Sequence, residues 1–264
     1  MVKYPNSLFM KRLSKMLLPL FLLMLSFINS PAQENGKEIL KRSQALVNGK
    51  SNKSKMTMTI IRPTWTREVS MQSWSVGDEY YLILVTAPAR DKGSVFMKRE
   101  KEMWNWMPSI GRMIKIPPSM MAQSWMGSDF TNDDLMKGSS VVDDYDQKIV
   151  GEEQISGVSC WKIEMIPVPS SAVVWGKVVI WIAREKYWQM KAEYYDEDLL
   201  KINSMFCDKI TRFNDRELPA RLTIIPEDKQ GNKTVIEFTN QEFDIPLTVG
   251  FFTQQKMKSI RTGE

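Results

Sequence analysis

The feature that most constrains the fold is a nearly unbroken succession of strand-like segments after residue 50. We predict strands at 55–62, 65–74, 79–86, 94–99, 101–107, 145–155, 158–166, 176–183, 188–195, 200–213, 217–225 and 233–243. Short turn signals such as Asp196-Glu197-Asp198 separate most of them. Many β segments with short connections predict an antiparallel meander rather than a parallel α/β fold. One amphipathic helix precedes them at 36–48, and Gly49 ends it.

Several of these segments carry apolar residues on both faces. In 177–182, three apolar side chains point one way, while Val179 and Trp181 point the other way. An antiparallel sheet with one face in water should instead alternate between apolar and polar residues. Few helices are available to cover a second apolar face. We therefore expect a mainly β protein with a strongly curved antiparallel sheet, in which one side packs as core and the other lines a cavity or lies under a small lid.

Residues 103–136 (MWNWMPSIGRMIKIPPSMMAQSWMGSDFTNDDLM) are unusually rich in Met and Trp, and Pro and Gly divide them into short pieces. Because Met is flexible and polarizable, a Met-rich surface repacks around ligands of different shape. Composition alone fits an irregular core segment equally well. Ser119–Met126 can form a short helix, and a second helix is expected to begin at Thr131. There Thr131 as N-cap and Asp134 at the third helical position resemble a capping box.

The N-terminus has the pattern of a secretory signal peptide. A basic lead is followed by the apolar run 16–28, and Ser30-Pro31-Ala32 supplies small residues before the expected cleavage site between Ala32 and Gln33. We therefore expect residues 1–32 to be removed and residues 33–264 to form a single exported domain. A retained N-terminal anchor is the alternative.

Charge does not indicate nucleic-acid binding. The chain has 36 Lys+Arg and 31 Asp+Glu, and the leader contains four of the basic residues and none of the acidic ones. The remainder, with 32 basic and 31 acidic residues, is nearly neutral, so the high isoelectric point reflects the leader. The two cysteines, Cys160 and Cys207, lie on strands that we predict not to be neighbours. We expect buried free thiols, with a disulfide as the alternative.

The chain contains no histidine. This excludes Ser–His–Asp and Cys–His catalysis and His-ligated zinc. No phosphate-binding glycine motif occurs. A group of six aspartates between Asp129 and Asp146 matches no calcium loop, and helix caps and turns explain most of its members. We expect no catalytic residues, no metal site and no cofactor. The aromatic residues among Met and Ile favour an acyl chain or another flexible apolar ligand over a sugar.

Several motifs resemble the outer-membrane lipoprotein-sorting, LolA-like proteins, and most closely the branch associated with transporters. The segments that carry the resemblance are Ala89–Ser94 (ARDKGS), Trp104–Ile116 (WNWMPSIGRMIKI), Ser119–Leu135 (SMMAQSWMGSDFTNDDL), Gly151–Glu153, Gly157–Trp161, Trp181-Ile182 and Ala192–Asp196. They occur in one order and register across nearly the whole chain after the leader.

The resemblance implies a half-open β-barrel of the LolA/LolB-like kind, with short helices plugging its mouth as a lid over a hydrophobic cavity. We then expect 113–135 to form the lid and Trp104 and Trp106 to form part of the wall. The candidate residues for the lipid-binding cavity or lid are Trp104, Trp106, Met113, Met120, Met121, Trp125, Met126, Phe130 and Leu135. Proteins of this family latch the lid with an arginine, for which Arg112 and Arg90 are the candidates. A hairpin turn with a local ion pair is the alternative role for Arg90.

Two functions fit this pattern. The first is a monomeric periplasmic carrier or chaperone that binds acyl chains of lipoproteins or lipids and works with an RND/MMPL-type or ABC transporter. The second is a non-carrier envelope sensor or accessory domain that binds a membrane-protein partner through the same apolar surface.

Overall fold

The computed structural model describes Met1, residues 35–137 and residues 141–261. The expected signal peptide and its cleavage site at Ala32 lie, apart from Met1, outside the described residues. The chain divides into two units, Met1–Glu34 and Asn35–Glu264, and the second unit contains the fold. Within the described part of the chain, no helix is long and apolar enough to cross a membrane.

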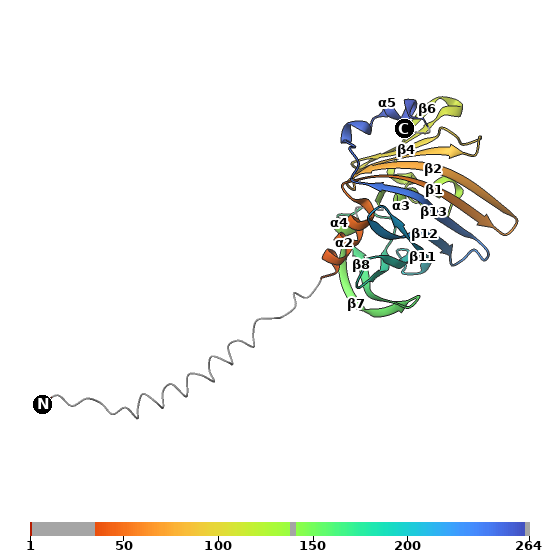
Figure 1. Ribbon diagram of the computed structural model, residues 1–264. Helices are drawn as coiled ribbons and strands as arrows, with labels where there is room; N and C mark the ends of the chain where they lie inside the picture. The colour runs from red at the N-terminus through yellow and green to blue at the C-terminus, as the bar shows by residue number, and fades with distance from the viewer. Residues whose placement is uncertain (2–34, 138–140, 262–264) are drawn as a thin grey trace. The chain divides into compact units, whose positions relative to one another are not determined.

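The second unit is built on one antiparallel sheet of 13 strands (Figure 1). The first group of strands is β1 (Ser51–Arg62), β2 (Trp65–Val76), β3 (Tyr80–Ala87), β4 (Val95–Arg99), β5 (Glu102–Met107) and β6 (Arg112–Ile116). The second group is β7 (Tyr145–Ile155), β8 (Val158–Pro167), β9 (Lys177–Ala183), β10 (Gln189–Tyr195), β11 (Lys201–Phe213), β12 (Arg216–Pro226) and β13 (Lys233–Phe243). Each group is a meander, and β1 pairs with β13 where the two groups meet.

The inner face of the sheet curves around short helices (Figure 1). These are α2 (Gly36–Asn48), α3 (Asn132–Lys137) and α4 (Val141–Asp144). Helix α2 begins because the Asn35 side chain accepts a hydrogen bond from the Glu38 N–H at 2.9 Å, and it ends at Gly49 with φ +60°. Its apolar residues Ile39 and Leu40 pack against Ile163 and other inner-face residues of the second strand group.

The outer face of β2 to β5 is covered by the C-terminal segment, which contains α5 (Gln254–Ser259). Phe252, Met257 and Ile260 are buried against Trp74, Leu82 and other outward-facing residues. We call this set, completed by Leu84, Val95 and Met97, the outer cluster. It explains the apolar outward-facing residues of β2 to β5, because the chain's own end covers that face. On β9, Val179 and Trp181 instead pack with Cys160 and Met190.

The predicted fold class is confirmed: the protein is mainly β, with a strongly curved, half-open antiparallel sheet and short helices. The helix predicted at 36–48 has the predicted bounds. The helix predicted at 119–126 is wrong, because two 3₁₀ turns, Pro118–Met120 and Trp125–Gly127, stand there instead. Strand β6 was missed, so Met113 belongs to the sheet and not to the lid. Both cysteines are free and buried.

Candidate ligand-binding cavity

Two cavities lie between the inner face of the sheet and the helices. The first has a volume of about 300 Å³ and the second about 260 Å³. Their linings share six residues, so the cavities adjoin. The shared residues are Val47, Asn48, Phe130, Asp134, Phe238 and Gln241. Each volume is near the lower end of the roughly 300–1,000 Å³ typical of small-molecule sites.

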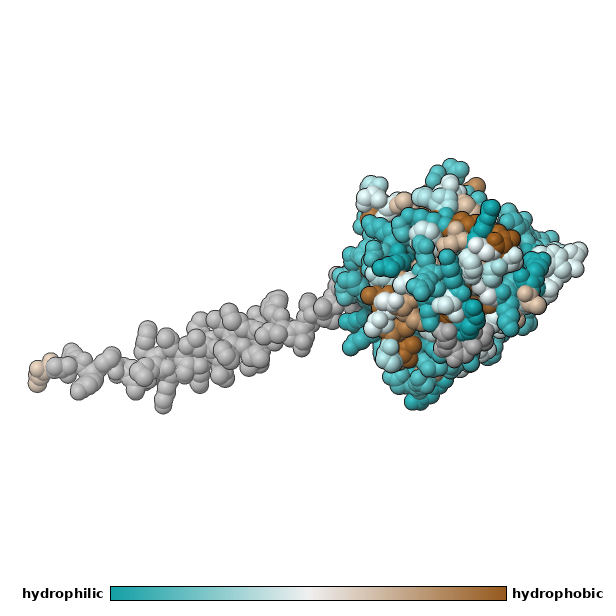
Figure 2. Space-filling model, turned by 90° about the horizontal axis from the view of Figure 1, so that it is seen from above, coloured by the Kyte–Doolittle hydropathy of each residue, from teal (hydrophilic) through white to brown (hydrophobic). Residues whose placement is uncertain are grey.

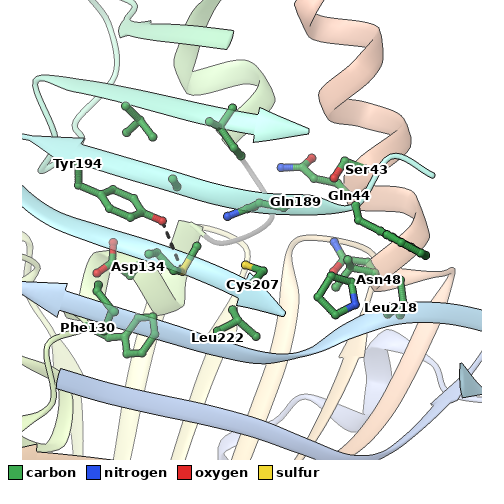
Figure 3. Close-up of a pocket in the computed structure, with 18 of the residues that line it drawn as sticks. Ser43, Gln44, Asn48, Phe130, Asp134, Gln189, Tyr194, Cys207, Leu218 and Leu222 are labelled. Carbon is green, nitrogen blue, oxygen red and sulfur yellow. Dashed lines mark hydrogen bonds between the residues drawn. The ribbon is translucent and has the colours of Figure 1, made fainter. Parts of the chain in front are cut away.

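The first cavity has an apolar wall formed by the second strand group. Its inner-face lining includes Met165, Val178, Ile180, Ala192, Met205 and Ile224, all of them buried. Figure 3 shows the polar residues Ser43, Gln44 and Asn48 of α2 at one side and Phe130 and Asp134 at the other. Tyr194 also lines the cavity, and its hydroxyl lies 3.9 Å from the Met205 sulfur.

The second cavity is lined mainly by the first strand group and is more polar. Asn52, Ser54, Ser73 and Lys98 are all buried and line it, together with the apolar Met56 and Ile83. The two adjoining cavities therefore differ in the chemistry of their walls although one sheet forms both.

Residues 117–135 form a lid that packs on the inner face of the first strand group. Trp125 is only 2% exposed and meets Phe96 in an edge-to-face arrangement, with ring centroids 5.4 Å apart. Met120, Met121 and Met126 pack against the same buried cluster. The lid thus closes over side chains that would otherwise present an apolar surface to water.

Two arginines of the β1–β2 hairpin hold the lid near its middle. Arg62 Nη2 donates to the Gly127 carbonyl at 2.9 Å, and Arg67 Nη1 donates to the Met126 carbonyl at 3.2 Å. Met126 and Gly127 have φ of +53° and +77°, a left-handed conformation that costs free energy for the non-glycine Met126. The turn points both carbonyls toward the arginines, and the hydrogen bonds from the arginines help to keep the turn in this conformation.

Both arginines are also paired with carboxylates. Arg62 Nη1 lies 2.9 Å from Asp129 Oδ2, and the two side chains are only 13% and 6% exposed. Arg67 Nη2 lies 2.6 Å from Asp91 Oδ2 in the Ala89–Ser94 motif. Asp129 also accepts a hydrogen bond from the Thr234 hydroxyl of β13 at 2.6 Å. The lid is thereby fixed to the sheet where the two strand groups meet.

The C-terminal end of the lid is held through the Asp134 carboxyl group. The predicted capping box is confirmed: the Thr131 N–H donates to Asp134 Oδ2 at 2.7 Å, and the Asp134 N–H donates to the Thr131 hydroxyl at 3.0 Å. The Trp175 indole N–H donates to Asp134 Oδ1 at 2.8 Å. This bond links α3 to the segment before β9. The lid therefore contacts both strand groups.

Burial shifts the pKa of several groups around the first cavity in the same direction. It raises the pKa of the Asp134 carboxyl above its usual range, and it raises the pKa of the Tyr194 and Tyr145 hydroxyls. It also raises the pKa of the Cys207 thiol to about 12. Each shift favours the uncharged form.

The structure places the sequence-derived candidates in three groups. Trp125, Phe130 and Leu135 line one or both cavities. Met120, Met121 and Met126 belong to the lid and pack on the inner face of the first strand group without lining a cavity. Trp104, Trp106 and Met113 lie elsewhere: they pack on the outer cluster, because the alternation along β5 and β6 turns them away from the cavities.

Among the described residues, the two arginines expected to latch the lid form no hydrogen bond or ion pair with residues 117–135. Arg112 is exposed on β6. Arg90 is also exposed, and its Nε lies 3.6 Å from Oδ1 of the neighbouring Asp91. This contact is the local ion pair that we considered as the alternative role of Arg90. Arg62 and Arg67 donate hydrogen bonds to the lid carbonyls instead. Arg62 and Arg67 stand 65 and 59 residues before the lid carbonyls, so only the folded sheet brings them together.

Among the described residues, no group of three or more His, Cys, Asp or Glu is placed to hold a metal ion. Three of the six aspartates between residues 129 and 146 form ion pairs or a helix cap. Asp129 pairs with Arg62, Asp134 caps α3, and Asp143 forms an exposed ion pair with Lys37. The arrangement is that of a lidded apolar cavity.

Several solved structures share this fold. A DUF1329 family protein from Desulfovibrio piger matches with a TM-score of 0.77 and 22% identity, over 84% of this chain and 97% of that one. An outer membrane lipoprotein-sorting protein domain from Vibrio parahaemolyticus matches with a TM-score of 0.75 and 19% identity, over 84% of this chain and 98% of that one. A LolA superfamily protein from Nitrosomonas europaea matches with a TM-score of 0.73 and 19% identity, over 84% of this chain and 99% of that one. The fold is LolA-like.

A family model described as "Uncharacterized protein" matches residues 77–259, from the β2–β3 turn to the end of α5. The chain belongs to that family. The resemblance to the LolA-like lipoprotein-sorting proteins that the motifs indicated is confirmed by the fold. A search of curated proteins finds no match. Because the sequence identities are 22% or less, these structures establish the LolA-like fold and do not identify a ligand.

Proposed function

We propose that this LolA-like protein is a monomeric periplasmic carrier or chaperone that binds acyl chains of lipids or lipoproteins and works with an envelope transporter. The observation that carries the proposal is the apolar first cavity of about 300 Å³ beneath a latched lid. A buried methylene group gains roughly 0.8 kcal/mol, so an acyl chain in this cavity is stabilised without any charged partner. The leader-like N-terminus and the fold agree with this role.

Release of the cargo would require the lid to open. The polar contacts that hold the lid are hydrogen bonds and ion pairs at its middle and its C-terminal end, while its Met and Trp side chains pack on the sheet. Breaking these polar contacts would release the lid without breaking any strand pairing of the sheet. This arrangement supports transfer of a bound chain to a partner.

Native mass spectrometry of the protein purified from cells without detergent tests the proposal. A carrier should show a fraction of molecules with an added mass of a lipid, and solvent extraction should release that lipid. Purified protein should also move a labelled lipid between two liposome populations. A protein that contains no lipid and transfers none would contradict the proposal.

One observation favours a partner-binding role, alone or beside carriage. The hairpin between β5 and β6 exposes Ile110 and Ile114, which are 59% and 37% exposed. Figure 2 views the molecule from the side of α5 and β6 and shows apolar patches among hydrophilic side chains. A non-carrier would associate stably with one membrane protein and exchange no lipid. Crosslinking on membranes, set against the liposome transfer assay, separates the two functions.

A further inference from the structure

A polar band crosses the inner face of five neighbouring strands, in the order β13, β1, β2, β3 and β4. The sheet register aligns its members: Gln241 opposes Ser54, Ser54 opposes Ser73, and Tyr81 opposes both Ser75 and Lys98. Asn52 opposes Ser75 one step further along β1. Because side chains alternate across a strand, all of these residues point to the same face. We call them the polar band.

The band interrupts a face that is otherwise apolar. Further along the same strands, the inner face presents Met56, Met58, Ile60, Val69, Met71, Ile83, Val85 and Phe96. The second cavity lies over the polar band, with all seven of its residues in the lining. Five of them, Asn52, Ser54, Ser73, Lys98 and Gln241, are at least nine-tenths buried. Buried polar groups are costly unless they are hydrogen-bonded, so a band of this size requires partners.

Some of these partners lie within the wall. The Ser54 and Ser73 hydroxyls are 2.7 Å apart, and the Lys98 ammonium donates to the Asp78 carbonyl at 2.6 Å. Two N–H groups in the same lining, Asn52 Nδ2 and Trp125 Nε1, have no acceptor among the described residues. A buried donor without an acceptor costs about 1–3 kcal/mol. Both groups are hydrogen-bond donors, so each requires an acceptor such as an oxygen atom.

The charges of the lining do not favour an anion. Lys98 contributes one ammonium, while Asp78 and Asp134 contribute two carboxyl groups. A carboxylate or phosphate would gain no net positive surroundings here. An uncharged group rich in acceptor oxygens would satisfy the two N–H groups and could also accept from the hydroxyls.

From this geometry we infer that the polar band is a head-group subsite, selective for an uncharged, acceptor-rich head such as a glyceryl ester, whose acyl chain extends into the first cavity. Six shared lining residues make the two cavities adjoin, so one amphiphile can occupy both. This inference rests on the proposed function, because it assumes that the first cavity takes an acyl chain. It adds the chemistry of the head group and the residues that recognise it.

Displacement of an apolar fluorescent dye by three ligands of equal chain length tests the inference. The ligands are 1-monooleoylglycerol, oleate and 1-octadecene. We expect 1-monooleoylglycerol to bind at least tenfold more tightly than 1-octadecene, and more tightly than oleate, because only its uncharged head supplies ester and hydroxyl oxygens. Equal affinities for all three, or tightest binding of oleate, would overturn the inference while leaving carriage intact.

Trp125→Phe removes one of the two N–H groups and keeps an aromatic ring against Phe96. We expect it to weaken 1-monooleoylglycerol binding about tenfold and to leave 1-octadecene binding unchanged. Trp104→Phe is the matched control, because Trp104 lines neither cavity, and it should change neither affinity. Asn52→Leu, which removes the other N–H group at similar volume, provides a second variant if Trp125→Phe fails to fold.

The outcomes separate the two claims. If the dye and all three ligands fail to bind the wild-type protein, the proposed carriage fails and the inference fails with it. If the ligands bind but Trp125→Phe and Asn52→Leu weaken 1-monooleoylglycerol and 1-octadecene equally, carriage stands and the head-group subsite is wrong.

Discussion

The two cavities share one sheet and one lid but differ in their walls. The first is surrounded by Met165, Val178 and other apolar side chains of the second strand group, whereas the second lies over the polar band of the first group and β13. A curved sheet supplies the space in both places. The residues on its inner face decide what that space can hold. The comparison teaches that a LolA-like fold by itself does not define the ligand, and that the polarity of each wall has to be examined strand by strand.

The largest effect should come from placing a charge in the apolar wall. Val178→Asp puts a carboxylate among apolar side chains with no cation, and we expect a loss of about 4 kcal/mol in the free energy of unfolding. Ser75→Asp, at the half-buried end of the polar band, should cost about 1 kcal/mol or less. Urea denaturation of both variants gives the two values. Equal losses would mean that the two walls do not differ as described.

Arg62→Ala should have the next largest effect, because it leaves the buried Asp129 carboxylate without its cation and the Gly127 carbonyl without its donor. We expect a loss of about 3 kcal/mol and faster exchange of ligand from both cavities, since one lid covers both. Thermal melts and stopped-flow dye release measure these changes.

Arg112→Ala is the control for the latch, since Arg112 is exposed on β6. Its effect on the free energy of unfolding should stay within about 0.5 kcal/mol. If the two arginine variants behave alike, the latch does not lie where the structure places it.

A smaller, pH-dependent effect should come from Asp134, which lines both cavities. Burial raises the pKa of this carboxyl in the folded protein. As the pH rises above the ordinary aspartate range, the unfolded chain loses this proton first, so the contribution of Asp134 to stability decreases. Asp134→Asn should remove this decrease and give a flatter dependence of Tm on pH above about pH 4. Parallel pH profiles for the two proteins would show that Asp134 does not titrate in this way.

The smallest effect concerns the two free thiols, which lie on opposite faces of the sheet. Cys207 lines the first cavity, whereas Cys160 packs with Trp181 and Met190 outside it. With the pKa of Cys207 at about 12, its alkylation at pH 8 should be slow in the folded protein. A bound acyl chain should slow alkylation of Cys207 further and leave Cys160 unchanged, as measured by peptide mass spectrometry. Protection of Cys160 alone would place the ligand outside the first cavity.

Features set by neighbouring residues were predictable from the sequence. The helix at 36–48 follows from its apolar spacing and Gly49, and the Thr131–Asp134 capping box follows from residues three positions apart. Strand β6 was hidden because Gly111 and Pro117 made its surroundings resemble a loop. The fold class followed from the succession of strands, which needs no knowledge of their register.

Features set by strand register were not predictable. Arg62 reaches the lid only because β1 ends beneath it, and no local pattern marks that position. Trp104 and Trp106 were expected in the cavity wall because they are large and aromatic, but a strand has two faces and the sequence does not say which one the C-terminal segment covers. The polar band combines residues from five strands spread from Asn52 to Gln241. Each of them, taken alone, looks like an ordinary polar strand residue.

Methyl NMR of the methionines tests the central claim most directly, because Met side chains lie both inside and outside the cavities. Met165 and Met205 line the first cavity, while Met97 and Met257 lie in the outer cluster. On addition of 1-monooleoylglycerol, we predict large chemical-shift changes and ligand contacts at Met165 and Met205, with Met97 and Met257 unchanged. Changes confined to Met97 and Met257, or none at any of the four, would contradict an acyl-chain site beneath the lid.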